Sequence, residues 1–340
     1  MNDQLVSSDG PELTSGEFRR ARQSHPGSSS PAPRLAVLAK QDVTYEATGV
    51  SLTTAEAVVE RLRGAVESTG ATGFGGFAGL YPLDERTRLA ASTDSVGTKL
   101  VLARERGALR ACGADLAAHC INDVAATGAD PLFLVDYVAA NRIDLEQVAE
   151  LVEGAAEVCR AAGCALLGGE TAELPGIYRD KELDFAGTCV GLVESERVVD
   201  GSRVQAGDAV VGLPSAGVHA NGFTLVRRVL EEEDYEGDDL LAPTRLYLDD
   251  VRRLRTETDV HGLAHVTGGG IVANLERVLP KGLRAEIDWR AWERPAVFRW
   301  LGRHVSEDEL RRVFNLGIGY CAVVHEAGDD TAVIGRIVPA

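Results

Sequence analysis

The stretch that most informs the interpretation of this chain is residues 93–99, Thr-Asp-Ser-Val-Gly-Thr-Lys. It follows a run at residues 88–92 that predicts a strand and precedes Leu-Val-Leu-Ala at 100–103, which predicts a helix. Backbone N–H groups and the helix dipole favour an anion where a strand gives way to a helix. Asp94 is a suitable ligand for Mg²⁺, and Lys99 a suitable partner for phosphate oxygens. The alternative is an ordinary strand–turn–helix connection, and the spacing of a Walker A loop is absent.

Composition restricts the classes of partner. The chain has 340 residues, enough for about two or three domains, and 45% of them are hydrophobic. A formal net charge of −17 argues against nucleic-acid binding, which needs basic patches, but permits a nucleotide ligand. No apolar run approaches a membrane span, and the N-terminus lacks a secretory signal pattern. The six cysteines form no CxxC pair, so we expect buried free thiols and a cytoplasmic location.

Hydrophobic periodicity predicts alternating helices and strands. Residues 1–40, rich in Ser, Pro and Gly, predict a disordered tail. The first part is expected to contain helices at 51–68, 110–128 and 144–162 and strands at 131–140, 164–167 and 184–193. The second is expected to contain helices at 222–232, 244–256, 270–278 and 306–314 and strands at 208–213, 261–266, 283–288, 318–325 and 331–338. The prediction is an α+β fold with two α/β-layer domains, at 41–200 and 201–340.

Further polar segments stand where a ligand site is expected. Asn122 and Asp123 interrupt an apolar helix, and helical spacing places positions 115, 119, 122 and 123 on one face, so Asp115 can share it. A buried Asp needs a metal or another partner. Residues 168–176, Gly-Gly-Glu-Thr-Ala-Glu-Leu-Pro-Gly, follow a buried strand and offer acids for Mg²⁺ or substrate. Glycine-rich runs at 72–79, 215–222 and 265–270 offer flexible backbone, hydroxyls and imidazoles for phosphate binding or proton transfer. The alternatives are an exposed helix face, polar turns and structural histidines; together the segments favour a Mg-nucleoside triphosphate and a second phosphorylated substrate.

The ordered motifs resemble those of the phosphoribosylformylglycinamidine cyclo-ligase (AIR synthetase) family, from about Tyr45 to the C-terminus. Besides the segments above, they include Leu-Leu-Ala-Pro-Thr-Arg at 240–245 and Phe-Asn-Leu-Gly-Ile-Gly at 314–319. The resemblance implies ATP-dependent ring closure of formylglycinamidine ribonucleotide to 5-aminoimidazole ribonucleotide (AIR), with release of ADP and phosphate, in purine synthesis. It also implies Mg²⁺ and a homodimer whose N-terminal sheets join in a β-barrel.

The resemblance also implies roles for individual residues. Mg²⁺ is expected at Asp94, Asp123 and Glu170, and catalytic roles at Lys99, His219 and Asn221. ATP is expected at Gly73, Gly75, Gly76, Asp94, Gly97, Thr98, Lys99, Asn122, Asp123, Gly168, Gly169, Glu170 and Thr171. Substrate or phosphate is expected at Ser215, Gly217, His265, Thr267, Gly268, Gly269 and Gly270.

Two segments depart from the family pattern. Ser95 replaces the usual glycine of Asp-Gly-Val-Gly-Thr-Lys, and residues 47–54 lack the acids of Ala-Gly-Val-Asp-Ile-Asp-Ala-Gly. These departures leave two alternatives open: another ATP-using enzyme of the same superfamily, or a non-catalytic nucleotide-binding protein.

Overall fold

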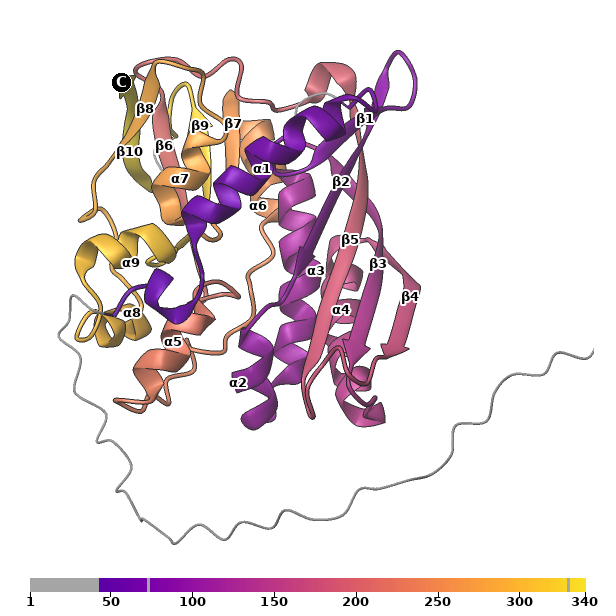
Figure 1. The fold of residues 1–340 in the computed structure, drawn as a ribbon. Coiled ribbons are helices and arrows are strands. Elements are labelled where there is room, and N and C mark those ends of the chain that lie inside the picture. Colours follow the sequence, from indigo (N-terminus) through magenta and orange to yellow (C-terminus); the bar gives the residue numbers. More distant parts are fainter. Residues whose placement is uncertain (1–42, 72–73, 329–330) are drawn as a thin grey trace, which may run out of the picture. The chain divides into compact units, whose positions relative to one another are not determined.

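The computed structural model describes residues 43–71, 74–328 and 331–340 (Figure 1). The expected tail at 1–40 and Gly73 lie outside these ranges. The described strands form two five-stranded sheets, each with its own hydrophobic core. Within these residues, no helix combines the length and apolarity that crossing a membrane requires. The division expected near residue 200 stays a prediction.

The first sheet has the strand order β1-β2-β5-β3-β4. Its strands are β1 (Gly79–Pro82), β2 (Thr87–Ser95), β3 (Asp130–Ala140), β4 (Ala165–Glu173) and β5 (Leu183–Glu194). Only the β3–β4 pair is parallel. Helices α3 (Leu109–Ala125) and α4 (Leu145–Ala162) cover one face of this sheet, and the short α2 (Lys99–Glu105) follows β2 (Figure 1). Gly113 lets α3 and α4 approach closely, because a Cβ there would collide with the Leu151 carbonyl.

The second sheet has the order β7-β9-β6-β10-β8 and is antiparallel throughout. Its strands are β6 (Ala209–Pro214), β7 (Val260–His265), β8 (Leu283–Ile287), β9 (Ile318–Val324) and β10 (Val333–Pro339). The helices of this part are α5 (Phe223–Leu230), α6 (Leu248–Glu257), α7 (Gly270–Glu276), α8 (Ala296–Leu301) and α9 (Glu307–Val313). Helix α1 (Leu52–Glu67) lies across the gap between the α7 region and β1 in Figure 1.

Most elements were predicted, and the differences have local causes. Strand β4 extends beyond the expected 164–167, so the Gly-Gly-Glu-Thr segment is strand rather than loop. Gly168, at φ 119°, accommodates the irregular register opposite Leu134 and Val135. Helix α6 begins at Leu248 rather than near 244, because side chains of α3 bind the backbone of Thr244, Arg245 and Tyr247 outside the helix. The short elements β1 and α8 had not been predicted.

Candidate functional site

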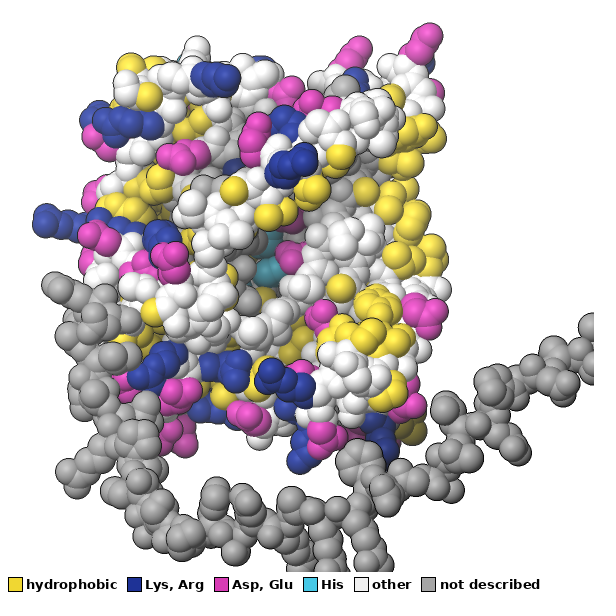
Figure 2. Space-filling view, in the orientation of Figure 1, with side chains coloured by type: hydrophobic (Ala, Val, Ile, Leu, Met, Phe, Trp, Pro, Cys, Tyr) yellow, Lys and Arg dark blue, Asp and Glu magenta, His cyan; other side chains and the backbone are white. Residues whose placement is uncertain are grey.

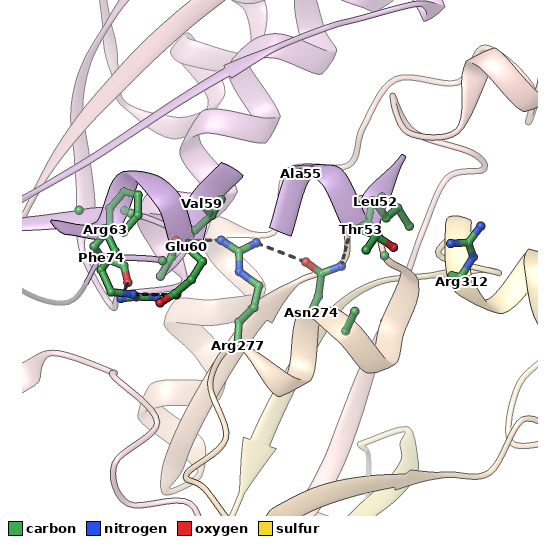
Figure 3. A pocket seen from close by; sticks show the side chains of 17 residues that line it. Leu52, Thr53, Ala55, Val59, Glu60, Arg63, Phe74, Asn274, Arg277 and Arg312 are labelled. Carbon is green, nitrogen blue, oxygen red and sulfur yellow. Dashed lines mark hydrogen bonds and ion pairs between the residues drawn. The ribbon is translucent and has the colours of Figure 1, made fainter. Parts of the chain in front are cut away.

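A cavity of about 960 Å³ brings together two glycine segments that are almost 200 residues apart in the sequence (Figure 3). Gly75 and Gly76 precede β1, whereas Gly268 and Gly269 precede α7. Helix α1 forms another wall. The remaining lining residues are Leu52, Thr53, Ala55, Val59, Glu60, Arg63, Phe74, Ala78, Gly79, Ala273, Asn274, Arg277 and Arg312.

Asn274 organises the glycine segment before α7. Its buried Nδ2 atom donates to the carbonyls of Thr267, Gly268 and Gly270 at 2.8–3.3 Å. Thr267 Oγ1 donates to Asn274 Oδ1 over 3.2 Å, which occupies the Thr267 hydroxyl proton that we expected to meet phosphate. Gly270 is buried against the Arg311 carbonyl, so it shapes the turn, whereas Gly268 and Gly269 face the cavity.

Two carboxylates, Asp94 of β2 and Asp123 of α3, each contact a residue of the other element. Asp94 Oδ1 accepts from the Ser95 N–H over 2.7 Å, and Asp94 Oδ2 lies 3.2 Å from His119 Nδ1. Asp123 Oδ2 accepts from Ser92 Oγ over 3.0 Å. The Asp94 side chain is 35% exposed, so it remains accessible to a ligand.

The imidazoles of His119 and His265 meet edge to face, with ring centroids 5.1 Å apart. His265 Nδ1 donates to Asp123 Oδ1 over 2.8 Å. Burial lowers the pKa of His265, so its ring is neutral. Burial opposes the charged form of His119 as well, but the hydrogen bond and charge of Asp94 raise its pKa overall. His265, expected to bind phosphate, instead has no exposed surface and positions Asp123.

Lys99 is not exposed at all. Its Nζ atom lies 2.7 Å from Asp115 Oδ2 and donates to the Ala242 carbonyl over 3.0 Å. Asp115 Oδ1 in turn accepts from the backbone N–H and the hydroxyl of Thr244, both at 2.7 Å. The expectation that Lys99 neutralises triphosphate charge does not fit this geometry, because the ammonium group is enclosed and already paired.

Asn122, about two helical turns after Asp115 on α3, also binds the backbone of the segment before α6. Its Nδ2 donates to the Arg245 carbonyl, and its Oδ1 accepts from the Tyr247 N–H, both at 2.9 Å. Buried and bonded in this way, it does not face the cavity. Asp115, His119, Asn122 and Asp123 thus form one polar face of α3, as their helical spacing had predicted.

Glu170 is separated from the other two expected metal ligands. In the sheet register, Glu170 lies in one row across the strands with Tyr137, Ala186 and Ser95. Asp94 lies in the neighbouring row, with Gly187 and Gly169. Neighbouring rows face opposite sides of a sheet, and three strand spacings amount to about 14 Å. Within one chain, Glu170 therefore cannot share a metal ion with Asp94.

Gly168, Gly169 and Thr171 lie with Glu170 on β4, the edge strand of the first sheet. They do not line the cavity. Gly97 and Thr98 line a separate hollow of about 230 Å³ beside residues 182–184. The described glycines and threonines expected at ATP thus lie in three separate places, and Lys99 and Asn122 are buried outside all three.

The segment 215–222 is tightly folded around His219, which has a left-handed φ of 65° and no exposed surface. The Ala216 N–H donates to His219 Nε2 over 3.3 Å, and burial lowers the pKa of His219 well below its usual value. Ser215 Oγ lies 3.0 Å from both Gly217 O and Asn315 Oδ1. These contacts make Ser215, Gly217 and His219 parts of a rigid loop rather than groups open to substrate.

Asn221 of that loop is partly exposed, and its Oδ1 lies close to Gly268 at the cavity. It therefore keeps a position suited to contacting a ligand. Sequence reasoning missed Asn274, Arg277 and the contact of His119 with Asp94. A carboxamide three residues before an arginine carries no known spacing signal, but His119 lies on the predicted polar face of α3.

Asp94 and Asp123 can serve a metal ion only as a partial set. Among the described residues, no group of three acidic, histidine or cysteine side chains is placed to enclose a metal. Mg²⁺ commonly takes one or two protein carboxylates and completes its shell with substrate phosphates and water. Asp94 and Asp123 fit that mode of binding, because they supply two carboxylates and the Asp94 side chain is accessible from solvent.

Comparisons with known proteins agree with the fold and the motifs. Residues 75–193 match the family model "AIR synthase related protein, N-terminal domain", and residues 205–334 match "AIR synthase related protein, C-terminal domain". Phosphoribosylformylglycinamidine cyclo-ligase of Synechococcus sp. (strain CC9605) is 46% identical over 311 residues, covering 85% of this chain and 90% of that protein. The enzyme of the same name from Nitrosococcus oceani is 43% identical over 329 residues, covering 87% and 92%.

A solved structure described as "AaThiL complexed with AMPPCP and TMP" has a similar fold, with a TM-score of 0.59 at 18% identity. The similarity covers 81% of this chain and 88% of that one.

Proposed function

This chain belongs to the AIR synthase related family, and from that premise we propose that it is a phosphoribosylformylglycinamidine cyclo-ligase. It converts formylglycinamidine ribonucleotide and ATP into 5-aminoimidazole ribonucleotide, ADP and phosphate in purine biosynthesis. The observation that carries this assignment is the sequence identity of 42–46% with enzymes of that name over most of the chain. A cavity of about 960 Å³, whose lining residue Arg277 lies within electrostatic range of Asp94 and Asp123, has room for a nucleotide and a second ligand.

The reaction requires an oxygen to leave a formyl carbon. Transfer of the γ-phosphoryl group to the formyl oxygen releases ADP and converts that oxygen into part of a good leaving group. A nitrogen of the substrate then attacks the formyl carbon; the new C–N bond closes the ring as the C–O bond breaks and phosphate departs with the oxygen. The protein must hold both reactants in line and stabilise the transferring charge.

Particular residues are suited to these tasks. Gly75, Gly76, Gly268 and Gly269 have no side chains, so the phosphates can approach the backbone closely. Helix α1 contributes Leu52, Thr53 and Val59 to the wall of the same cavity (Figure 3). Asn221 is placed to orient the substrate at Gly268.

We propose that Asp94 and Asp123 hold Mg²⁺ together with the nucleotide phosphates, whose charge the ion would partly neutralise. His119 of α3 and His265 of β7 fix the two carboxylates by hydrogen bonds. Such outer contacts orient ligands before the ion arrives. Glu170 would need a second copy of the chain to reach such an ion.

We also propose a homodimer formed through the uncovered face of the first sheet. Leu132, Val135 and Tyr137 of β3 and Leu167 of β4 are 36–65% exposed. Figure 2 shows apolar side chains in a band along this side of the molecule. Burying an exposed apolar face of this kind favours association, and a second copy provides a matching face. A cytoplasmic location stays a prediction; all six cysteines are buried free thiols.

The test is to supply purified protein with Mg·ATP and formylglycinamidine ribonucleotide and to quantify ADP and AIR. Equal amounts of both products are expected. ADP formation with a different small molecule, but none with this substrate, would assign the chain to another ATP-using enzyme of the superfamily. ATP binding without ADP release on any substrate would indicate a nucleotide-binding protein.

A further inference from the structure

The proposed reaction brings phosphate groups into a strongly acidic protein, so the cavity needs a cation of its own. Lys99 does not supply it, because Asp115 already neutralises its ammonium group. The described lining of the cavity contains three cationic side chains: Arg63, Arg277 and Arg312. The three arginines differ in whether a carboxylate pairs with them, and this difference identifies the one whose charge is available to a ligand.

Two of these arginines are already neutralised. Arg63 Nε lies 3.0 Å from Glu60, and its Nη1 lies 3.6 Å from Glu67. Arg312 makes two contacts with Glu309, at 2.9 and 3.0 Å. In Figure 3, Arg63 lies against Glu60 on one side of the cavity, and Arg312 lies at the opposite side.

Arg277 has no such partner. No carboxylate of the described residues lies within 4.0 Å of its guanidinium group, and Asp94 and Asp123 pair with histidines instead. Burial lowers the pKa of Arg277, and the charges of Asp123 and Asp94 oppose that lowering only in part. Its Nη2 donates to the Gly76 carbonyl over 2.8 Å, and its Nη1 lies 3.4 Å from Asn274 Oδ1. Arginine carries five N–H donors, so several remain free.

The position of Arg277 is held from both parts of the chain. The guanidinium carbon lies 3.9 Å from the centre of the Phe77 ring, a cation–π contact that fixes its plane. Gly76 and Phe77 belong to the segment before β1, whereas Arg277 follows α7. The side chain therefore ties the two glycine segments of the cavity together.

Resting on the proposed function, we propose that Arg277 is the residue that binds phosphoryl oxygens in this cavity, the role that Lys99 does not fill. A planar fork of free N–H donors matches two phosphate oxygens at once. Asp94 and Asp123 are close enough for their charges to act on Arg277. An anion held by Arg277 would therefore also lie near a metal ion on those carboxylates. Bound phosphate would also strengthen the attachment of Gly76 and Phe77 through the same side chain.

The phosphate could belong to the triphosphate or to the 5′-phosphate of the second substrate, and binding measurements distinguish the two. Isothermal titration calorimetry would measure the Kd of Mg·AMP-PCP and, separately, of ribose 5-phosphate. The proteins compared are wild type, Arg277→Gln, Arg277→Lys and Arg284→Gln. Arg284 is an exposed arginine of β8 outside the cavity, so its variant controls for net charge. We expect Arg277→Gln to weaken one ligand about 10- to 100-fold, Arg277→Lys to weaken it less, and Arg284→Gln to change it less than about twofold.

A loss confined to AMP-PCP assigns Arg277 to the triphosphate, and a loss confined to ribose 5-phosphate assigns it to the substrate; either supports the proposal. Unchanged binding of both ligands by a folded Arg277→Gln protein overturns it. The binding measurement needs no turnover, so it is independent of the activity assay. If the wild-type protein forms ADP and AIR but the Arg277 variant binds both ligands normally, the proposed role of Arg277 is rejected and the proposed function stands.

A measurement on wild type covers the case in which the variant does not fold. Phenylglyoxal modifies accessible arginines, and mass spectrometry locates the products. Mg·AMP-PCP or ribose 5-phosphate should protect Arg277 several-fold and leave Arg284 unaffected. Equal modification of Arg277 with and without both ligands would contradict the proposal.

Discussion

Replacing Lys99 by methionine tests whether the most conspicuous lysine of the sequence is structural or binds ATP. Methionine keeps most of the length of the side chain but loses the cation–π contact with Phe223, whose ring centre lies 5.4 Å from the ammonium nitrogen. It removes the charge opposite Asp115, whose side chain has no exposed surface. Breaking a buried ion pair by removing one partner costs about 3–5 kcal/mol of unfolding free energy.

This loss converts into a measurable temperature shift. With about 2.1 cal/mol/K of unfolding entropy per residue and roughly 300 folded residues, Tm should fall by about 5–8 °C. Differential scanning calorimetry measures it. Lys281→Met, at an exposed lysine, is the matched control and should change the unfolding free energy by less than about 0.5 kcal/mol.

A double variant isolates the ion pair. Lys99→Met combined with Asp115→Asn removes both charges, while the Asn oxygen still accepts from Thr244. We expect it to recover about 2 kcal/mol or more relative to Lys99→Met alone. The reasoning is refuted if Lys99→Met melts like wild type but binds Mg·AMP-PCP more than about tenfold more weakly, since Lys99 would then act on the nucleotide.

Three other perturbations test the remaining parts of the site. Asp94→Asn should lower kcat/KM by about 100-fold or more, because one proposed metal carboxylate loses its charge, whereas Tm should change little. Steady-state kinetics and calorimetry measure the two effects. Turnover at the wild-type rate would exclude the metal role. His219 is kept neutral by burial, whereas in the unfolded chain it takes up a proton near its ordinary pKa of about 6.5. Stability should therefore decrease as pH falls from 7.5 to 5.5, and His219→Gln should show a smaller decrease in Tm; an equal decrease would mean that other groups cause it. Val135→Asp places a charge on the uncovered sheet face and should shift the dimer toward monomer in light scattering, whereas a dimer of unchanged stability would place the interface elsewhere.

Much of the fold was predictable because the local signals were consistent. Asp144 was expected to begin a helix, and its side chain caps α4 by accepting from the Gln147 N–H over 3.1 Å. The glycine-rich segments were expected to approach a ligand, and two of them line one cavity. The expected loop at Gly168 and Gly169 was wrong, because pairing with β3 extends β4 through both glycines.

The sequence by itself determined the family, the order of helices and strands and the residue types of the site, because each depends on local spacing. Only the tertiary structure decided what each polar group meets. It encloses Lys99 with Asp115, turns Glu170 to the opposite face of the sheet from Asp94, and places Arg277 against Gly76, 201 residues away. Such contacts depend on how the two sheets and their helices pack, and a charged residue has the same local pattern whether packing buries it in an ion pair or leaves it open to a ligand.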